Sequence, residues 1–179
     1  MQNLVTRALP GIGALVTAVA VAAPAQAAPP ANAQQAQDTC IDYLVQTIRA
    51  MPEGTYLDSL PDAARPTSPG SVLPTGTGSA FLPRAEYYSL DYRAFGDSAE
   101  ALMNSAESAW QSIGWQPNRK PPFPNGSYET QTNPADGYLL SAILGVGPAG
   151  TAVTLSCSTN ETFPGGGPAP APAPPALFP

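Results

Sequence analysis

The chain contains no histidine, and this absence removes several common enzyme designs. Ser-His-Asp and Cys-His catalytic arrangements need an imidazole as general base, and the usual proton shuttle and histidine metal sites are lost with it. Lysine is almost absent too. Lys120 is the only one, and its position beside Pro121 in a proline-rich stretch is typical of a solvated side chain rather than a desolvated catalytic amine. The sequence predicts no catalytic, cofactor-binding or metal-binding residue.

Charged residues are scarce, and most of them are acidic. They make up 11% of the chain, with 13 acidic and 7 basic side chains and a formal net charge of −6. No basic stripe is available to displace counterions from phosphates, so we expect neither nucleic acid nor anionic lipid as a partner. After residue 27 no apolar run is long enough for a transmembrane helix, so none is expected in the mature chain.

Only two cysteines are present, Cys40 and Cys157. Two thiols without histidine do not complete a tetrahedral zinc site, whereas a pair of cysteines in an exported chain is typical of a disulfide. The sequence predicts a Cys40–Cys157 bridge. Because it would close a loop of more than ~100 residues, it would stabilise the fold by about 4–5 kcal/mol on the chain-entropy model.

Residues 1–27 have the layout of a cleaved secretory signal peptide. Arg7 precedes an uncharged run from 8 to 23 that is rich in Ala and Val, and Ala25-Gln26-Ala27 matches the small-residue A-x-A cleavage site. The run is shorter than the ~20 residues of a membrane-spanning helix. An uncleaved membrane anchor is the alternative. We expect a secreted or cell-envelope protein whose mature chain begins at Ala28.

Both ends of the mature chain are poor in core-forming residues. Residues 28–37 consist largely of Ala, Pro, Gln and Asn, which predicts a disordered lead-in. Residues 164–179 read PGGGPAPAPAPPALFP, and alternating Pro and Ala favour extended polyproline II. The second segment predicts a stiff, exposed, disordered tail. One folded domain would then cover 38–163, with an irregular loop at 52–83 that is either functional or mobile.

Two segments have the apolar spacing of helices. The first covers 39–51 and stops at Pro52; the second follows Asp97, an N-cap that can form a capping box with Glu100, and ends at Gly114. The apolar stripes are Ile41, Leu44, Val45 and Ile48 in the first helix, and Ala99, Leu102, Met103, Ala106, Trp110 and Ile113 in the second.

Four further segments have the composition or alternation of strands. They are 86–95, 128–132, 138–144 and 151–157. In the last, alternation places Cys157 on the core face with Val153 and Leu155, so a bridge to Cys40 would tie the first helix across the sheet. The predicted fold class is α+β: two helices packed on a small antiparallel sheet of three or four strands, in two layers, with one disulfide and disordered termini.

One observation keeps an enzymatic hypothesis open, and a second does not. Gly96-Asp97-Ser98 resembles the nucleophile block of the SGNH (GDS-type) hydrolases, but those enzymes also need a later Asp-x-x-His, which this chain lacks. A helix N-cap explains Asp97 and Ser98 fully, so we favour that interpretation. Thirteen acidic residues leave catalysis by paired carboxylates open. The alternative hypothesis is therefore a histidine-free, carboxylate-dependent hydrolase or glycan-processing enzyme.

Aromatic residues suggest a binding surface. Tyr87, Tyr88 and Tyr92 lie in one predicted strand, and Trp115 follows the end of the second helix. An exposed aromatic row can stack on sugars or meet an apolar patch of a protein. We therefore take these four residues as the candidate binding surface, whereas Trp110, on an apolar helical stripe, is expected in the core.

Several stretches look like small exported proteins of actinobacteria, mycobacterial ones in particular. They are the Ala-rich signal segment, the Trp110-(x)₄-Trp115 helix end, the strand start Asp136-Gly137-Tyr138-Leu139-Leu140 and the strand end Val153-Thr154-Leu155-Ser156-Cys157-Ser158. The Pro-Ala tail is similar to that of mycobacterial secreted Ala-Pro-rich proteins. The resemblance covers 98–158 and, by composition, the termini. It implies an exported protein of a group largely without assigned activity, and it transfers no catalytic residue.

Taken together, these features predict a non-enzymatic exported protein of a bacterial cell envelope. It would be a disulfide-bridged module that binds an envelope protein or a cell-wall glycan, with its tail reaching into the wall. A third hypothesis is a passive structural or antigenic product whose proline-rich segments matter more than any site.

Overall fold

The structure is a computed structural model that describes residues 30–59, 70–74, 85–134, 137–148, 150–160, 162–165 and 167–179. The predicted signal peptide, and much of the predicted irregular loop 52–83, lie outside these residues. At 70–74 and 85–87 only the backbone is described. In the part of the chain that is described, no helix combines the length and the apolar character needed to cross a membrane.

The described residues form two helices and nine strands. In chain order they are α1 (Ala33–Arg49), β1 (Tyr56–Asp58), β2 (Gly70–Pro74), β3 (Ala85–Phe95), α2 (Ala99–Ser112), β4 (Asn118–Arg119), β5 (Tyr128–Thr132), β6 (Tyr138–Gly147), β7 (Gly150–Thr159), β8 (Phe163–Pro164) and β9 (Ala176–Leu177). The prediction of an α+β fold with two helices on an antiparallel sheet is confirmed.

The strands form one antiparallel sheet in the order β4-β5-β6-β7-β3-β1-β9. The long strand β3 organises it, since β7 and β8 pair along one edge and β1 and β2 along the other. The sheet has more strands than predicted. β1 and β2 lie within 52–83, so the prediction of an irregular loop is wrong for those two stretches. The sequence did not reveal β1, β4, β8 and β9, which are only two or three residues long. Strands this short leave no alternation to detect in a sequence.

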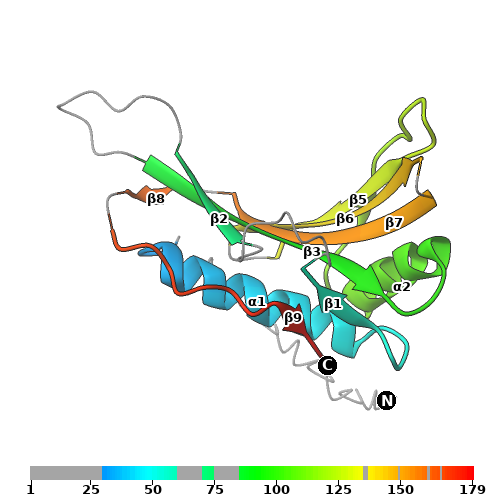
Figure 1. Cartoon of the computed structure of the whole chain (residues 1–179), viewed down its shortest axis with the longest axis horizontal. Coiled ribbons are helices and arrows are strands. Elements are labelled where there is room, and N and C mark those ends of the chain that lie inside the picture. The colour runs from blue at the N-terminus through cyan, green and yellow to red at the C-terminus, as the bar shows by residue number, and fades with distance from the viewer. Residues whose placement is uncertain are drawn as a thin grey trace, which may run out of the picture.

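Both helices lie on the same side of the sheet, and the core lies between the two layers (Figure 1). Alternate residues of the central strands face the helices and are buried: Tyr88, Leu90, Tyr92 and Ala94 on β3, Val153, Leu155 and Cys157 on β7, and Tyr138, Leu140, Ala142 and Leu144 on β6. The helices contribute Leu44, Ile48, Leu102, Met103, Ala106 and Trp110. The apolar stripes of the sequence therefore meet in one core.

A disulfide joins Cys40 on α1 to Cys157 on β7, as predicted. The sulfur atoms are 2.06 Å apart, the Cα atoms are 5.4 Å apart, and the bridge spans 117 residues of sequence. Both cysteines are fully buried. The bond therefore fixes the first helix to the middle of the sheet, and it is consistent with an extracytoplasmic location.

Helix α1 begins six residues before the predicted start at residue 39. Asn32 caps it, because its Oδ1 accepts a hydrogen bond of 2.9 Å from the backbone N–H of Gln35. Ala36 and Gln37 in the first turns are buried. The prediction of a disordered lead-in is wrong for 32–37, since Ala and Gln are good helix formers and this turn packs against the rest of the chain.

The caps of α2 differ slightly from the prediction. Ser98, not Asp97, is the N-cap, and its side chain accepts from the N–H of Ala101. Asp97 instead accepts from the N–H of Ser98 at 2.7 Å, and Glu100 is turned toward the sheet rather than into a capping box. Gly114 ends the helix as predicted, with φ at 88°.

The C-terminal segment is docked on the domain, with two of its side chains buried and most of its residues still exposed. It runs along α1, in red in Figure 1, and ends in β9, which pairs with β1 through Leu57↔Leu177. Ala173 and Leu177 are only 3% and 5% exposed. The prediction of a disordered tail at 164–179 is therefore wrong for 171–177, whereas the predicted exposure is confirmed for most of these residues. Composition correctly excludes a helix there, but it does not reveal that other parts of the chain bind the extended segment.

Candidate binding surface

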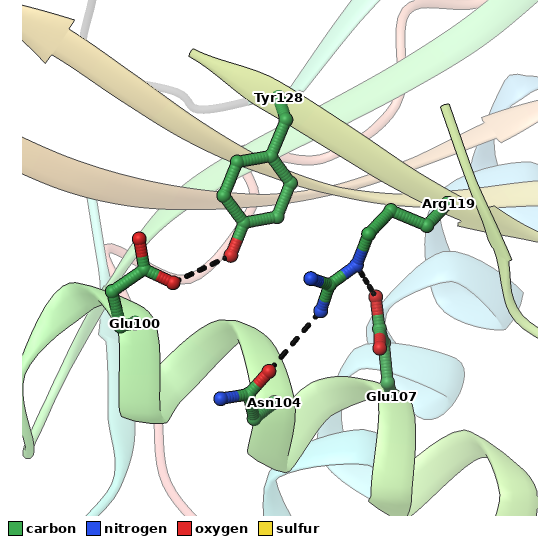
Figure 2. Close-up of polar contacts among 5 residues, drawn as sticks. All are labelled: Glu100, Asn104, Glu107, Arg119 and Tyr128. Atoms are coloured by element: carbon green, nitrogen blue, oxygen red, sulfur yellow. Dashed lines mark hydrogen bonds and ion pairs between the residues drawn. The ribbon is translucent and has the colours of Figure 1, made fainter. Parts of the chain in front are cut away.

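A cluster of five polar side chains joins α2 to β4 and β5 (Figure 2). Glu100, Asn104 and Glu107 follow one another along α2 at spacings of four and three residues, so they share one face of the helix. Arg119 on β4 and Tyr128 on β5 reach that face from the sheet. This polar cluster is the first place to look for chemistry.

Each member of the polar cluster is engaged by another member. Arg119 Nε forms an ion pair with Glu107 Oε1 at 2.8 Å, and Arg119 Nη2 donates to Asn104 Oδ1 at 3.1 Å. The Tyr128 hydroxyl donates to Glu100 Oε2 at 2.9 Å. The guanidinium carbon of Arg119 also lies 4.8 Å from the centroid of the Tyr128 ring, a cation–π contact.

These contacts raise the pKa values of the tyrosine and the arginine of the cluster. Burial, followed by the hydrogen bond to Glu100, raises the pKa of Tyr128 to about 12. The hydrogen bond to Glu107 raises the pKa of Arg119. Glu100 and Glu107 are about 10 Å apart along the helix axis, because seven residues separate them. The cluster therefore connects α2 to β4 and β5, and it does not bring two carboxylates together.

Two residues of the predicted aromatic surface lie in the core. Tyr88 is 0% and Tyr92 is 1% exposed, because both lie on the helix-facing side of β3. The Tyr88 hydroxyl donates to Gln37 Oε1 at 2.8 Å, and the Tyr92 hydroxyl donates to the carbonyl oxygen of Pro174 at 2.6 Å. The prediction that these two tyrosines belong to an exposed row is wrong.

Of the remaining two predicted surface residues, only Trp115 has a described side chain, and it packs against the core. Trp115 is partly buried and meets the ring of Tyr43 edge-on, with centroids 5.1 Å apart. Tyr43 in turn meets Tyr138 at 5.6 Å. Trp115 therefore covers the end of the core. The side chain of Tyr87 lies outside the described residues.

The sheet face turned away from the helices is the larger candidate surface, and we call it the open face. No described helix packs on it (Figure 1). Its side chains alternate with the buried ones and are mostly half-buried or exposed: Tyr56 and Asp58 on β1, Ser89, Asp91, Arg93 and Phe95 on β3, Ala152, Thr154, Ser156 and Ser158 on β7, Leu139, Ser141 and Ile143 on β6, and Glu129 and Gln131 on β5.

Strand pairing aligns the open face into polar rows. One row runs through Gln131, Ser141, Ser156 and Asp91, which are direct partners on four neighbouring strands. The next row runs through Glu129, Ile143, Thr154, Arg93 and Asp58. At ~4.8 Å between strands, the first row is about 14 Å long. Amide, hydroxyl, carboxylate and guanidinium groups thus stand side by side on one surface.

An aromatic stack borders these rows. The ring of Tyr56 lies between Phe95, at a centroid distance of 5.2 Å, and Phe178, at 5.7 Å, and both pairs are nearly parallel. The guanidinium of Arg93 lies 5.4 Å from the centroid of Phe95. Tyr56 is half-buried, whereas Phe178 is 65% exposed and presents aromatic surface to solvent. The docked C-terminal segment supplies this exposed end of the stack.

A hollow of about 210 Å³ opens beside the stack, between the end of β3, the start of α2 and the start of β7. Arg93, Phe95, Asp97 and Thr151 are among its lining residues. A second hollow, of about 310 Å³, has Glu53 and Asp97 in its lining, and both of these carboxylates are exposed. Among the described residues, no group of three acidic or cysteine side chains could hold a metal ion.

Sequence reasoning missed the aromatic stack because its three members come from separate segments. Phe95 ends a predicted strand, Tyr56 lies in the segment predicted as an irregular loop, and Phe178 lies in the predicted tail. The alternation of Asp91, Arg93 and Phe95 with buried residues was the one detectable signal. Comparison with protein-family models, with curated proteins and with solved structures finds no match to this chain.

Proposed function

We propose that this chain is an exported, non-enzymatic protein of a bacterial cell envelope that binds wall glycan through the open face of its sheet. One observation carries the proposal: the stack of Phe178, Tyr56 and Phe95 borders aligned rows of polar side chains on a face that no described helix covers. The Cys40–Cys157 disulfide supports export, because such bonds persist in oxidising compartments.

The chemistry of the open face suits a polysaccharide. Sugar rings offer hydroxyl groups to carboxylate, amide and hydroxyl partners, and their apolar faces pack on aromatic rings. Asp91, Ser156 and Gln131 supply the first kind of contact along one row. Phe178 supplies the second at the border of the face. A row across four strands fits an extended chain better than a small compact ligand.

The same geometry argues against the hydrolase alternative. Asp58 lies opposite Arg93, and Asp91 lies two residues along the same strand face, so Asp58 and Asp91 are diagonal neighbours on adjacent strands. The acid of a glycosidase, however, is held protonated by an apolar environment, whereas Asp91 is exposed. An exposed and a half-buried carboxylate beside an arginine are better suited to hydrogen-bonding a glycan than to cleaving it.

Binding to purified peptidoglycan tests the proposal. The wild-type chain is expected to sediment with the insoluble wall material, and Tyr56→Ala is expected to reduce the bound fraction severalfold. Phe123→Ala is the control, because it also removes an aromatic ring, but Phe123 is 56% exposed and lies away from the open face in the segment between β4 and β5. Chemical-shift mapping with a soluble N-acetylglucosamine hexamer would locate contacts at Ser156 and Asp91.

Three results would count against this function. Equal binding by Tyr56→Ala and Phe123→Ala would remove the open face as the site. Loss of binding after protease treatment of the wall material would assign the surface to a protein partner. Release of shortened sugar chains by the wild type, and not by Asp91→Asn, would restore the carboxylate hydrolase.

A further inference from the structure

The C-terminal segment occupies a groove formed by α1, the end of β1 and the helix-facing side of β3. Residues 171–175 are held by four hydrogen bonds. Gln34 Oε1 accepts from the N–H of Ala171 at 2.7 Å, and Gln37 Nε2 donates to the carbonyl of the same residue at 2.8 Å. The Tyr92 hydroxyl donates to the Pro174 carbonyl oxygen at 2.6 Å. The N–H of Ser59 donates to the Pro175 carbonyl oxygen at 2.8 Å.

These partners match the chemistry of a proline-rich peptide. Proline has no N–H, so a Pro-Ala strand carries many more acceptors than donors and cannot satisfy them within itself. The groove supplies three donors to carbonyl oxygens and one acceptor to an alanine N–H. One of these donors, Ser59, directly follows β1, in which Leu57 pairs with Leu177 of the segment. Other proteins recognise extended peptides by the same two modes, which are pairing with a strand edge and docking of a polyproline II segment.

Side-chain sites fix the position of the segment in the groove. Ala173 is 3% and Leu177 is 5% exposed, so a small and a large apolar side chain are each enclosed, four residues apart. Gln37 is itself 3% exposed, and the hydroxyl of Tyr88 donates to its Oε1 at 2.8 Å. This bond holds the amide so that Nε2 faces Ala171. Tyr88 is therefore a positioning residue for the groove.

We propose that this groove is a binding site for extended Ala/Pro-rich peptides, and that it accepts the C-terminal segment of a second copy of the chain in exchange for its own. The segment follows Gly165-Gly166-Gly167 in the sequence. Glycine adopts backbone conformations that other residues cannot, and a short permissive linker before an exchangeable element favours swapping between protomers. Two copies that exchange segments would form a closed dimer with unchanged contacts in each groove.

Peptide binding to the oxidised full-length chain tests the groove. The probe is a fluorescent peptide, PAPAPAPPALFP, identical to residues 168–179. Leu177→Asp weakens binding of the chain's own C-terminal segment to the groove but leaves the groove residues unchanged. In wild type, that segment competes with the probe at ~mM effective concentration. The variant is therefore expected to bind the probe at least about tenfold more tightly than wild type. Ala169→Asp adds the same charge at an exposed tail position and is expected to match wild type.

Two further measurements keep the proposal testable if Leu177→Asp does not fold. In the otherwise unchanged chain, Tyr92→Phe removes the bond to Pro174 and should speed hydrogen exchange at the amides of Ala171 and Leu177. A probe peptide with Asp at the position of Leu177 should not bind any variant. Failure of the matching probe to bind folded Leu177→Asp, or unchanged exchange in Tyr92→Phe, would overturn the binding site.

The oligomeric state of the protein tests whether the segment of a second copy binds in the groove. After incubation at about millimolar concentration, light scattering should show a dimer fraction for wild type and for Ala169→Asp, and none for Leu177→Asp. Probe binding combined with a strictly monomeric wild type would overturn exchange between copies. Glycan binding is measured by sedimentation with peptidoglycan, whereas the groove is measured by probe binding and hydrogen exchange. The two proposals therefore fail in separate experiments, although Phe178 of the segment belongs to the aromatic stack.

Discussion

The indole Nε1 of Trp110 donates a hydrogen bond of 3.0 Å to the hydroxyl oxygen of Thr47, which lies 63 residues earlier in the chain. Trp110 and Thr47 are each 1% exposed, so the bond sits inside the interface between α2 and α1. The Thr47 hydroxyl donates in turn to the backbone carbonyl of Tyr43 at 2.9 Å. One threonine thus satisfies the only polar group of a buried tryptophan and fixes the relative position of the two helices.

Replacing Thr47 by valine should destabilise the fold by about 1–3 kcal/mol, because the buried indole N–H loses its acceptor while the side-chain volume hardly changes. Denaturant unfolding followed by tryptophan fluorescence measures the effect. Thr39→Val makes the same chemical change on the same helix at a half-exposed position, and it should stay within about 0.5 kcal/mol of wild type. Equal losses in both variants would mean that the Thr47–Trp110 bond contributes nothing specific.

Removal of the Cys40–Cys157 bond should cost about 4–5 kcal/mol, because the bridge spans 117 residues and restricts the unfolded chain. The double replacement Cys40→Ala with Cys157→Ala avoids leaving a free thiol, and reductant should lower the unfolding midpoint of the wild type alone. Urea unfolding with and without reductant measures both effects. Identical wild-type curves under the two conditions, or two alkylatable thiols in native material, would contradict the bridge.

The regular part of the fold could be predicted from the sequence because its residues carry a period. Leu44 and Ile48 on α1, and Leu102, Ala106 and Trp110 on α2, repeat at helical spacing, and all five are buried. The strand alternation that placed Cys157 on the core face was sufficient to connect α1 to the sheet. Such patterns reflect a property of each segment alone, namely which of its faces can be buried.

The candidate site could not be predicted because it depends on which segments meet. In the sequence of an aromatic-rich strand, the face that will be buried cannot be told from the exposed face until the side covered by helices is known. For this reason Tyr88 and Tyr92 were wrongly predicted to lie on the surface. Residues 171–177 have no period and no core composition. Their order comes from hydrogen bonds supplied by residues more than 80 positions away, such as Gln37 and Tyr92.

Alkaline pH should destabilise the protein partly through Tyr128. Burial and the hydrogen bond to Glu100 raise the pKa of Tyr128 from 10.0 to about 12. Below pH 10 the folded and unfolded chains both keep this proton; between pH 10 and 12 the unfolded chain releases it first, so the free energy of unfolding falls as pH rises. Burial also raises the pKa values of Tyr88 and Tyr92, which act in the same direction.

Tyr128→Phe should therefore lose stability less steeply than wild type between pH 10 and 12, although it is less stable at pH 7 because Glu100 loses its donor. Urea unfolding at several pH values in this range gives the slope for each protein. Tyrosinate absorbance near 295 nm should rise later in folded than in denatured wild type. A parallel pH dependence in the two proteins would remove Tyr128 from the alkaline transition.

Gly96 joins β3 to α2 in a backbone conformation that few other residues adopt, with φ at 145°. A Cβ there would lie 3.3 Å from both Cα and Oγ1 of Thr55, and Thr55 is only 2% exposed, so it has little room to move. Gly96→Ala should therefore cost about 1–3 kcal/mol. Because Phe95 and Tyr56 adjoin these two residues, the variant should also disturb the aromatic stack of the open face.

Gly147→Ala provides the control for the Gly96 variant, since its φ is not positive and a Cβ at that position meets nothing within 4 Å. It should unfold within about 0.5 kcal/mol of wild type. Thermal unfolding compares the stability of the two variants. Sedimentation with peptidoglycan shows whether Gly96→Ala also weakens binding by the open face, as expected if the aromatic stack is disturbed. If Gly96→Ala were as stable as Gly147→Ala, the close approach of β3 to Thr55 would impose no constraint, and the alignment of Tyr56 with Phe95 would need another cause.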